Sequence, residues 1–450
     1  MIQKIFLLLL ITLNIFAYEK TTDDKNVYFE SQHFRVVIGI RYSNSVSMKN
    51  LAYKYLDNAE FSWSKEIDEL GFRSPKNTEI KKIDMFVGNR YAYNYETNSY
   101  ENIPSNYAGW TTSYPSDGTP YFVLSSDIDD NSLKVTISHE FFHTIQYAYI
   151  NNSLISDDKW FKNVWWLEAT AVLLEDEVYD DINDYLWFLD PFFTNSYKNF
   201  EIYDGTHEYA MVIFAKYIRE KYGMGIIEDS FKVINSSGED GFFEILDTLL
   251  IEDYNSNMKI ALNEFAKWVS NPPKYFSEGS SYPELKHFKL NDSTPIEKGG
   301  VKIVDSLVDG WNMVALSESD LNVTDLPSLD IIWGYKDGRW SNSIYGELNH
   351  LNSSDGYWVK ANAESSLYYT YFDKSIYELS TINNEWNFLA TTKPLSLESL
   401  DVDEILIWQF RENQWYAYSN NEELKERLRE LDYPILEVIP SFSAYWIKKL

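Results

Sequence analysis

Apolar residues recur at helical spacing in two consecutive segments near the middle of the chain. Between Ser132 and Tyr149 they cover nearly every side of a helix, at Val135, Ile137, Phe141, Phe142, Ile145 and Ala148. A helix that is apolar all round is buried, so the pattern predicts a buried helix with Asn131 or Ser132 as its N-cap. A second helix is predicted over Asn163–Tyr179, with an apolar body that includes Trp166, Leu167, Val172, Leu173 and Leu174.

The flanking segments predict strands before these two helices and more helices after them. The strands are His33–Tyr42, Ile83–Gly88 and Thr119–Ser126, and a helix over Ser47–Leu70 separates the first two. We expect the strand over Thr119–Ser126 to be the exposed edge of the sheet. The later helices are Thr206–Tyr222, Ile226–Asn235, Gly241–Leu250 and Asn255–Val269. This order predicts an α+β fold in which a small sheet packs on helices.

A change of pattern follows residue 272. Residues 273–302 are rich in Ser, Pro, Gly and charge and predict a linker. Beyond it, Trp311-Asn312-Met313-Val314-Ala315 recurs 75 positions later as Trp386-Asn387-Phe388-Leu389-Ala390. Tyr357-Trp358-Val359-Lys360 recurs as Tyr445-Trp446-Ile447-Lys448 after an insertion that predicts a short helix over Glu422–Leu431. These signals predict two β-rich repeats, residues 303–375 and 376–450, after a domain of residues 18–272.

The first buried helix carries the pattern His-Glu-x-x-His at His139, Glu140 and His143. Residues four apart lie on one face of a helix, so both histidines can direct a ring nitrogen at one metal ion. Glu140 lies about 100° round the helix, where it can reach a water on that metal without being a ligand. A zinc ion with one water ligand brings the pKa of that water to about 7, and a nearby carboxylate can accept its proton. The pattern therefore predicts a zinc hydrolase.

A third ligand is predicted from the second helix. Glu168 is the only carboxylate in the first ten residues of Asn163–Tyr179, where it stands among Trp and Ala. A carboxylate in so apolar a setting is normally paired or bound to a metal. Glu175 falls two turns further on the same face, where we expect it to hydrogen bond a ligand histidine.

At these residues the chain resembles the gluzincin metallopeptidases, and more closely a family of secreted bacterial metalloproteases. The latter is built around His-Glu-Phe-Phe-His-x-x-Gln followed by Trp-x-Glu-(Gly/Ala)-Thr-Ala, and the resemblance extends from about Tyr28 to Trp268. It implies a zinc peptidase with His139, His143 and Glu168 as metal ligands and Glu140 as the general base. Two residues depart from the pattern. Ala169 stands where the family often has Gly, and Val172 stands where thermolysin-like enzymes place an Asp behind the first histidine.

Peptide hydrolysis also needs a group that stabilises the negative charge on the carbonyl oxygen, and gluzincins commonly use a Tyr or His. His207 and Tyr209, near the start of the helix predicted over Thr206–Tyr222, are the candidates. The Gly-x-Met-Glu-Asn segment with which gluzincin aminopeptidases hold a substrate amine does not precede His139. An endopeptidase is therefore favoured.

The first residues predict export. Met1–Lys4 is a short basic region, Ile5–Phe16 is largely apolar, and Ala17 suits cleavage, so residues 1–17 are predicted to be a signal peptide. We expect the mature protein to be secreted or on the cell surface, with the periplasm as an alternative, and to have no membrane span after cleavage. The sequence contains no Cys, which excludes disulfides, zinc–thiolate sites and cysteine nucleophiles.

The net charge of the chain argues against two classes of binding partner. A formal net charge of −30 disfavours nucleic acid and anionic membrane surfaces. The closely spaced oxygens of Asp127–Asn131 suggest Ca²⁺, but the segment lacks the Gly and distal Glu of a calcium loop, so capping of the following helix is the simpler interpretation.

Three classes of function remain open from the sequence. The first is a secreted zinc endopeptidase acting on proteins or peptides. The second is a zinc hydrolase of another bond, such as an ester or a cell-wall peptide. The third is a surface adhesin or ligand-binding protein with an inactive hydrolase domain, whose Trp-rich repeats bind a surface, a glycan or a protein.

Overall fold

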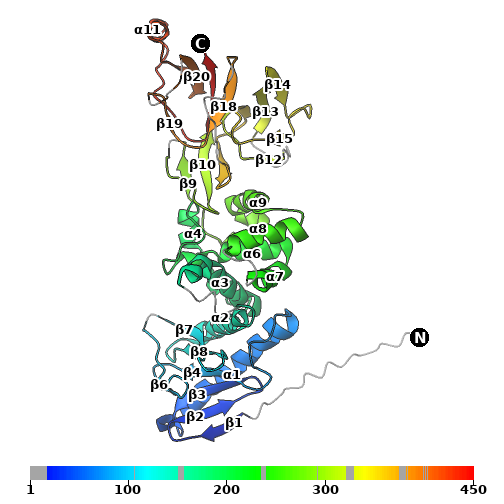
Figure 1. Ribbon diagram of the computed structural model, residues 1–450, viewed down its shortest axis with the longest axis vertical. Coiled ribbons are helices and arrows are strands. Elements are labelled where there is room, and N and C mark those ends of the chain that lie inside the picture. Colours follow the sequence, from blue (N-terminus) through cyan, green and yellow to red (C-terminus); the bar gives the residue numbers. More distant parts are fainter. Residues whose placement is uncertain are drawn as a thin grey trace, which may run out of the picture. The chain divides into compact units, whose positions relative to one another are not determined.

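The computed structural model describes residues 18–450 except 106, 151–156, 235–239, 291, 321–328, 374–381, 383, 399, 401 and 403. The predicted signal peptide lies outside the described residues. The chain forms two compact units and is of the α+β class (Figure 1). The first unit contains residues up to 154 and Thr170–Tyr185, and the second contains Ile155–Ala169 and Leu186–Leu450.

A six-stranded sheet organises the first unit. Its order is β1-β2-β3-β4-β8-β7, in which β3, β4 and β8 run parallel and the outer pairs are antiparallel. The strands are β1 Glu19–Thr22, β2 Asn26–Glu30, β3 Phe34–Gly39, β4 Ile83–Val87, β7 Gly109–Ser113 and β8 Pro120–Leu124. A short hairpin of β5 Tyr93–Asn94 and β6 Ser99–Tyr100 forms a separate two-stranded sheet, which hydrogen bonds to the side chain of Asn26 on β2.

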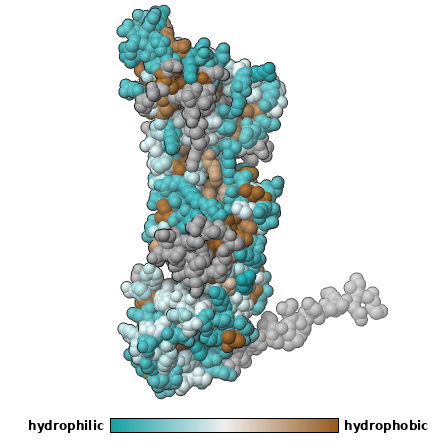
Figure 2. Space-filling model, viewed as in Figure 1, coloured by the Kyte–Doolittle hydropathy of each residue, from teal (hydrophilic) through white to brown (hydrophobic). Residues whose placement is uncertain are grey.

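Two helices cover one face of this sheet. They are α1, Val46–Trp63, and α2, Asp130–Tyr149, and a π-helical turn extends α1 over Ser64–Glu69. Phe34 on β3 meets Phe141 on α2 with ring centroids 5.2 Å apart. The opposite face has its own apolar cluster around Val37, Phe86, Tyr121 and Val123. The parallel strands are therefore buried on both faces, and the face of this unit seen in Figure 2 is largely hydrophilic.

The prediction that Thr119–Ser126 forms the edge of the sheet is wrong. β8 lies between β4 and β7 and is buried along its whole length, so its backbone is paired on both sides. The edge strand on this side is β7, whose five residues are half-buried. The uniform run Tyr121-Phe122-Val123-Leu124 is typical of an interior strand.

Several helix boundaries also differ from the predicted ones. The N-cap of α2 is Asp129, whose carboxylate accepts hydrogen bonds from the backbone N–H groups of Asn131 and Ser132. Helix α3 spans Asp157–Val178 and so begins six residues before the predicted start. The predicted helix over Thr206–Tyr222 is two helices that meet at Met211, namely α5, His207–Ala210, and α6, Val212–Tyr222.

The second unit combines helices with most of the β structure. Before its β structure, this unit contains α5 and α6 together with α4 Asp190–Asn195, α7 Gly225–Val233, α8 Phe242–Asp253, α9 Met258–Ser270 and α10 Pro272–Tyr275. The segment predicted as a linker contains β9, His287–Lys289, which pairs in parallel with β10, Val301–Leu307. β17, Ser365–Thr370, completes this three-stranded sheet.

An eight-stranded sheet occupies the remainder of the chain. Its strands are β11 Gly310–Val314, β13 Leu329–Lys336, β14 Arg339–Asn342, β16 Tyr357–Ala361, β18 Asn387–Thr391, β20 Ile405–Arg411, β21 Gln414–Ser419 and β23 Ser443–Lys449. The first four pair in the order β14-β13-β16-β11, and the last four in the order β21-β20-β23-β18. The order of pairing is thus the same in both halves.

The register of pairing is the same as well. Met313 faces Trp358 in the first half, and Phe388 faces Trp446 in the second. Val314 on β11 then pairs with Ser443 on β23 and joins the halves, and an isolated bridge between Asp355 and Leu389 joins them again. The predicted short helix is present as α11, Glu422–Glu430.

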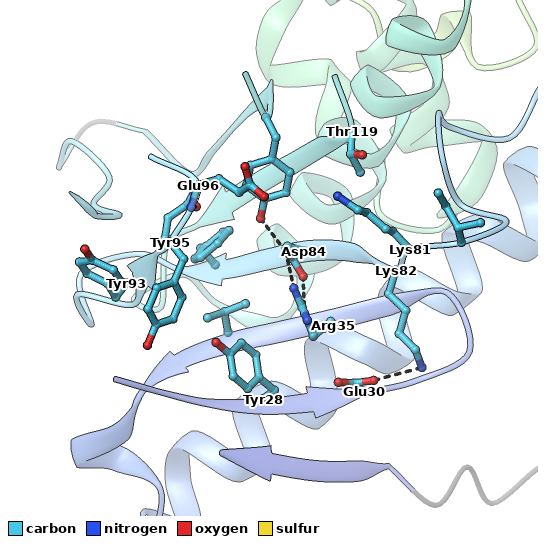
Figure 3. Close-up of a pocket in the computed structure, with 15 residues that line it drawn as sticks. Tyr28, Glu30, Arg35, Lys81, Lys82, Asp84, Tyr93, Tyr95, Glu96 and Thr119 are labelled. Carbon is cyan, nitrogen blue, oxygen red and sulfur yellow. Dashed lines mark hydrogen bonds and ion pairs between the residues drawn. The ribbon is translucent and has the colours of Figure 1, made fainter. Parts of the chain in front are cut away.

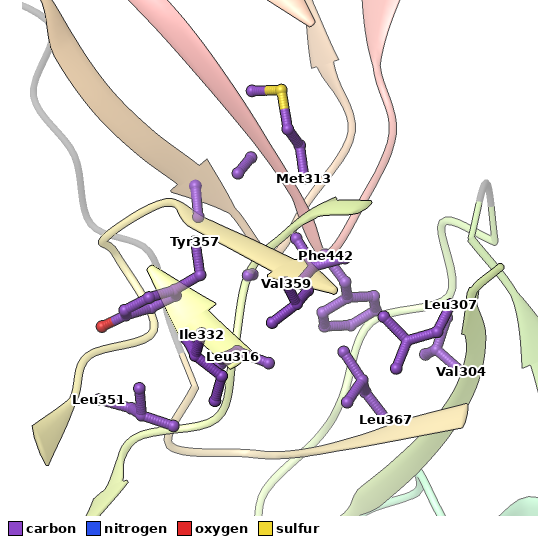
Figure 4. Packing of buried hydrophobic residues seen from close by; sticks show 14 of the residues in the cluster. Val304, Leu307, Met313, Leu316, Ile332, Leu351, Tyr357, Val359, Leu367 and Phe442 are labelled. Atoms are coloured by element: carbon purple, nitrogen blue, oxygen red, sulfur yellow. The ribbon is translucent and has the colours of Figure 1, made fainter. Parts of the chain in front are cut away.

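The apolar core beneath this sheet draws on both halves. Figure 4 shows Val359 from the first half close to Phe442 from the second, and Met313 and Tyr357 belong to the same cluster. Phe388, Ala390 and Ala444 belong to the same buried cluster. The first half therefore completes its core with residues that follow position 385.

A chain that ends at Asp373 tests this dependence. We expect the amide protons of β11, β13 and β16 to lose protection against hydrogen exchange, because the truncation removes Phe388, Phe442 and Ala444 from their core. Strands β2–β4 of the first unit, measured in the same sample, should keep their protection. Retained protection in β11, β13 and β16 would show that the first half folds alone.

Candidate metal centre

His139 and His143 lie on one face of α2 and direct a ring nitrogen at each other. Their Nε2 atoms are 3.1 Å apart and their rings are nearly perpendicular, at 87°. His139 is 9% exposed, and the helix around both residues is buried. The spacing of four along the helix produces this convergence, as the sequence predicts.

The second nitrogen of each ring has an oxygen acceptor. Nδ1 of His139 is 2.6 Å from Oε1 of Glu175, and Nδ1 of His143 is 2.8 Å from Oε1 of Gln146. Gln146 is oriented by Thr170, to whose Oγ1 its amide donates at 3.1 Å. Since a carboxylate and an amide oxygen accept, both Nδ1 atoms carry the proton in the neutral rings. The predicted hydrogen bond between Glu175 and one of the two histidines is present.

With both protons on Nδ1, the Nε2 atoms of the two rings are acceptors 3.1 Å apart, and both can bind one cation. Two nitrogen ligands of one tetrahedral zinc ion are separated by about 3.3 Å, given Zn–N distances near 2.05 Å. The donor set and its spacing therefore fit a zinc ion, and acceptors on Nδ1 are the usual support of a metal-binding histidine.

Glu168 completes the predicted ligand set. One ligand atom from each of His139, His143 and Glu168 lies within 4.8 Å of the others. Glu168 and Glu175 belong to the continuous helix α3, in which seven residues make two turns and about 10 Å. The helix that orients His139 through Glu175 thereby also carries Glu168 on the same face.

Glu140 is held by the edge strand β7. Its Oε2 accepts a hydrogen bond of 2.6 Å from the hydroxyl of Thr111, which also reaches the Glu140 carbonyl oxygen at 3.0 Å. A Cβ atom at Gly109 would lie 2.7 Å from the Glu140 carboxylate, so a side chain at this position would displace it. Alternate residues of β7 thus leave room for the carboxylate and orient it.

Further buried polar groups lie behind the histidines. Ser138 donates to Oε1 of Glu66 at 2.9 Å, and burial raises the pKa of Glu66 well above its usual value. Burial likewise raises the pKa of Glu175 to about 7, against the opposing effect of the hydrogen bond with His139. Glu66 is not among the residues predicted from the sequence. The only sequence signal for it is an acidic residue at a buried position of the helix predicted over Ser47–Leu70.

His207 and Tyr209 differ in their surroundings. His207 is 2% exposed, and burial lowers its pKa to about 4. Smaller effects come from nearby charges: those of Asp204 and Glu297 raise the pKa of His207, and that of Lys198 lowers it. The Nε2 atom of His207 has no hydrogen-bond partner among the described residues. Tyr209 is half-buried and stacks on Phe188 with ring centroids 5.5 Å apart.

Helix α5 also carries Glu208, which the sequence analysis did not single out. This carboxylate is fully buried and accepts hydrogen bonds from the backbone N–H groups of Asp204 and Gly205. Burial raises its pKa, and the negative charge of Glu168 adds to the effect. The α5 segment therefore lies close enough to Glu168, the third predicted ligand, for the charge of Glu168 to affect the pKa of Glu208.

The acidic segment before α2 acts as a helix cap. Besides the two backbone hydrogen bonds, Asp129 accepts a bond of 2.6 Å from the Ser132 hydroxyl, which together with these bonds lowers its pKa. Asp130 pairs with Lys54 at 2.5 Å. These contacts agree with the interpretation that Asp127–Asn131 caps the following helix.

A polar pocket of about 370 Å³ lies elsewhere in the first unit (Figure 3). Arg35 and Asp84 form a two-bond ion pair at its centre, with distances of 2.6 and 2.8 Å, and Tyr114 donates to the same carboxylate. Lys82 pairs with Glu30 at its rim. None of the predicted site residues lines this pocket.

Comparison with protein families matches residues 23–249 to a family described as a family of unknown function, DUF6055. The chain belongs to this family. The part matched to DUF6055 contains α2, α3 and β7, and it ends before the eight-stranded sheet begins. No curated protein matches the chain. None of the described helices is long and apolar enough to cross a membrane.

Replacing Glu175 by Gln tests the support of His139. The substitution keeps the shape but removes the charged acceptor, so we expect zinc affinity to fall about 10- to 100-fold. Competition with a chromophoric chelator measures the change. Glu177→Gln, on the same helix, is the control and should bind zinc like the parent chain. Equal affinity in all three proteins would make Glu175 a purely structural residue.

The buried His207 predicts a loss of stability in acid. Its pKa is 6.5 when unperturbed and about 4 in the folded chain, so between these values the unfolded state binds more protons. The free energy of unfolding should therefore fall by about 3 kcal/mol from this residue as the pH drops from 7 to 4. Denaturant titrations of the parent chain and of His207→Gln measure it, since the variant should lose correspondingly less. Equal pH dependence of the two proteins would contradict the burial argument.

Proposed function

We propose that this protein is a zinc-dependent endopeptidase of gluzincin type. The observation that carries the proposal is the convergence of His139 Nε2, His143 Nε2 and a Glu168 carboxylate oxygen, with Glu140 beside them on α2. A zinc ion bound there would lower the pKa of a water molecule and polarise the scissile carbonyl. Its protein ligands are one carboxylate and two neutral imidazoles, as in open catalytic zinc sites.

Glu140 is the general base in this proposal. It lies next to His139 on the helix but is oriented differently, by Thr111 on the neighbouring strand. It is 5% exposed, so its immediate surroundings hold little bulk water and favour proton transfer to and from the carboxylate. In this role the Glu140 carboxylate accepts the proton of the attacking water and passes it to the leaving amine.

Strand β7 is the proposed platform for the substrate backbone. It is the edge of its sheet, and its free side offers backbone N–H and C=O groups to an extended peptide. The same strand orients Glu140 through Thr111, so a peptide paired with β7 would run close to the general base. Recognition through backbone groups along a strand suits cleavage within a chain rather than removal of a terminal residue.

Tyr209 is the proposed stabiliser of the carbonyl oxygen. Of the two candidates, it has solvent-exposed surface with which to meet a substrate, whereas His207 is almost completely buried. His207 then serves to position the start of α5. A phenolic hydroxyl can donate a hydrogen bond to the developing oxyanion.

Two alternatives to an endopeptidase remain, and experiments can distinguish them from it: a zinc hydrolase of a different bond and a binding protein. The same site would serve a zinc hydrolase of a different bond, since only the shape of the cleft selects the substrate. A binding protein with an inactive hydrolase domain is favoured by a group of exposed aromatic residues on the eight-stranded sheet. In each case we propose, from the predicted signal peptide, that the protein acts outside the cytoplasm.

Glu140→Gln is the deciding variant. We expect about one zinc ion per chain in both the parent and the variant, because Glu140 is not a ligand. Digestion of casein and of a quenched fluorescent peptide library should fall by at least about 100-fold in the variant, as expected for loss of a general base. Chelation should abolish activity of the parent chain, and added zinc should restore it.

The outcomes separate the three functions. Hydrolysis of esters but not of peptides, lost in Glu140→Gln, would assign a different bond. Stoichiometric zinc without any hydrolysis would favour the binding protein. Absence of zinc from both proteins, with none taken up on titration, would overturn the proposed metal centre.

A further inference from the structure

The two halves of the eight-stranded sheet exchange aromatic contacts. Trp446 of the second half packs against Tyr335 and Trp340 of the first, with ring centroids 5.0 and 5.7 Å apart. Reciprocally, Trp358 of the first half packs against Phe410 and Trp415 of the second, at 5.2 and 5.9 Å. In the sequence, Tyr335 and Trp340 of the first half correspond to Phe410 and Trp415 of the second, and Trp358 corresponds to Trp446. The halves are thus related like the two subunits of a symmetric dimer.

The aromatic residues around Trp446 line a pocket. The equivalent residues around Trp358 do not form the same pocket, because one of its lining residues has no counterpart in the first half. The insertion with α11 brings Tyr433 to Trp408, with ring centroids 4.8 Å apart at 84°, and the first half has no equivalent insertion. The resulting open pocket has a volume of about 470 Å³. Its lining consists entirely of aromatic residues from both halves: Tyr335, Trp340, Trp386, Trp408, Trp415, Tyr433 and Trp446.

These seven side chains are not part of the buried core. Trp340 is 43% exposed and Tyr433 is 36% exposed, and the other five are half-buried. Exposed aromatic surface of this extent is retained in soluble proteins chiefly where something binds. The pocket therefore has the character of a binding site.

The polar groups of the lining are almost all donors. Five indole N–H groups and two phenolic hydroxyls belong to the lining residues, and among the described residues none of them hydrogen bonds to the protein. The lining contains no carboxylate, amide or charged side chain. A matching ligand presents flat apolar faces together with hydrogen-bond acceptors and needs few acceptors in return.

We propose that this pocket binds a proline-rich polypeptide segment in the polyproline II conformation. Proline rings present flat C–H faces to the aromatic rings, and the backbone of such a segment offers carbonyl oxygens without proline N–H groups. Its preformed conformation loses little entropy on binding, and aromatic-lined grooves with indole and phenol donors recognise it in other proteins. The partner is therefore a protein with an exposed proline-rich stretch.

Charge supports an uncharged or basic segment. The chain carries a net charge of −30, which repels nucleic acids, anionic glycans and acidic peptides. A quaternary ammonium ligand is disfavoured locally, because the ammonium group of Lys448 already lies 6.0 Å from the ring centre of Trp386. Neutral sugars share the flat C–H faces, but their many hydroxyl donors require acceptors that this lining does not supply.

Titration of the full chain with a blocked ten-proline peptide tests the proposal. Calorimetry and tryptophan fluorescence should both report binding, and a blocked Gly-Ser peptide of equal length should not bind. Trp386→Ala and Tyr433→Ala should each weaken binding at least about tenfold, as expected for central aromatic contacts. Tyr433 is exposed, so its replacement leaves the core intact, and thermal unfolding checks both variants.

Trp311→Ala is the matched control. Trp311 is the counterpart of Trp386 in the first half, is 41% exposed and lies outside the pocket, so its replacement should leave binding unchanged. Equal loss in Trp311→Ala and Trp386→Ala would overturn the assignment of the site. Failure of the peptide to bind at millimolar concentration would overturn the ligand class. Binding of cello- or chito-oligosaccharides instead, lost in Trp386→Ala, would replace it with a neutral glycan.

Discussion

The buried hydrogen bond between His139 on α2 and Glu175 on α3 is the interaction on which the rest of the candidate site depends. It joins two apolar helices through polar groups that would be costly to bury alone. It also fixes the tautomer of the ring and turns Nε2 toward His143. Because α3 is continuous, the same contact sets the position of Glu168 two turns earlier. With Glu66 and Gln146, the polar groups behind the histidines form a hydrogen-bonded layer within an otherwise apolar interior.

The edge strand β7 supplies the other constraint on the site. Its residues Gly109 and Thr111 lie on the face of the strand that meets α2, one leaving space for the Glu140 carboxylate and the other donating to it. Glu140, the proposed general base, is thus oriented by the sheet, whereas the proposed metal ligands are oriented by helix–helix packing. In this arrangement an edge strand lies next to the proposed site without contributing a proposed ligand.

The β-rich part of the chain is built from two halves that pack against each other. Two halves with equal strand order share one core and exchange tryptophan contacts, so neither half buries its aromatic residues alone. An insertion in the second half then breaks the equivalence and adds Tyr433 to one side only. The two halves thus share one core, and the insertion adds one of the aromatic residues that line the pocket.

The sequence by itself determined what depends on local periodicity. The i, i+4 spacing of His139 and His143 and the two-turn spacing of Glu168 and Glu175 are properties of single helices, and the α+β class follows from the order of elements. Tertiary structure decided what depends on pairing between distant segments. The apolar run of β8 is typical of an interior strand, but which strand pairs with its far side, and that β7 is the edge, depends on pairing between segments. Nor did the sequence show that Glu66 lies behind Ser138, that Thr111 holds Glu140, or that the two halves of the β-rich part combine into one sheet. Those contacts join residues 29 to more than 70 positions apart, and periodicity carries no information over such separations.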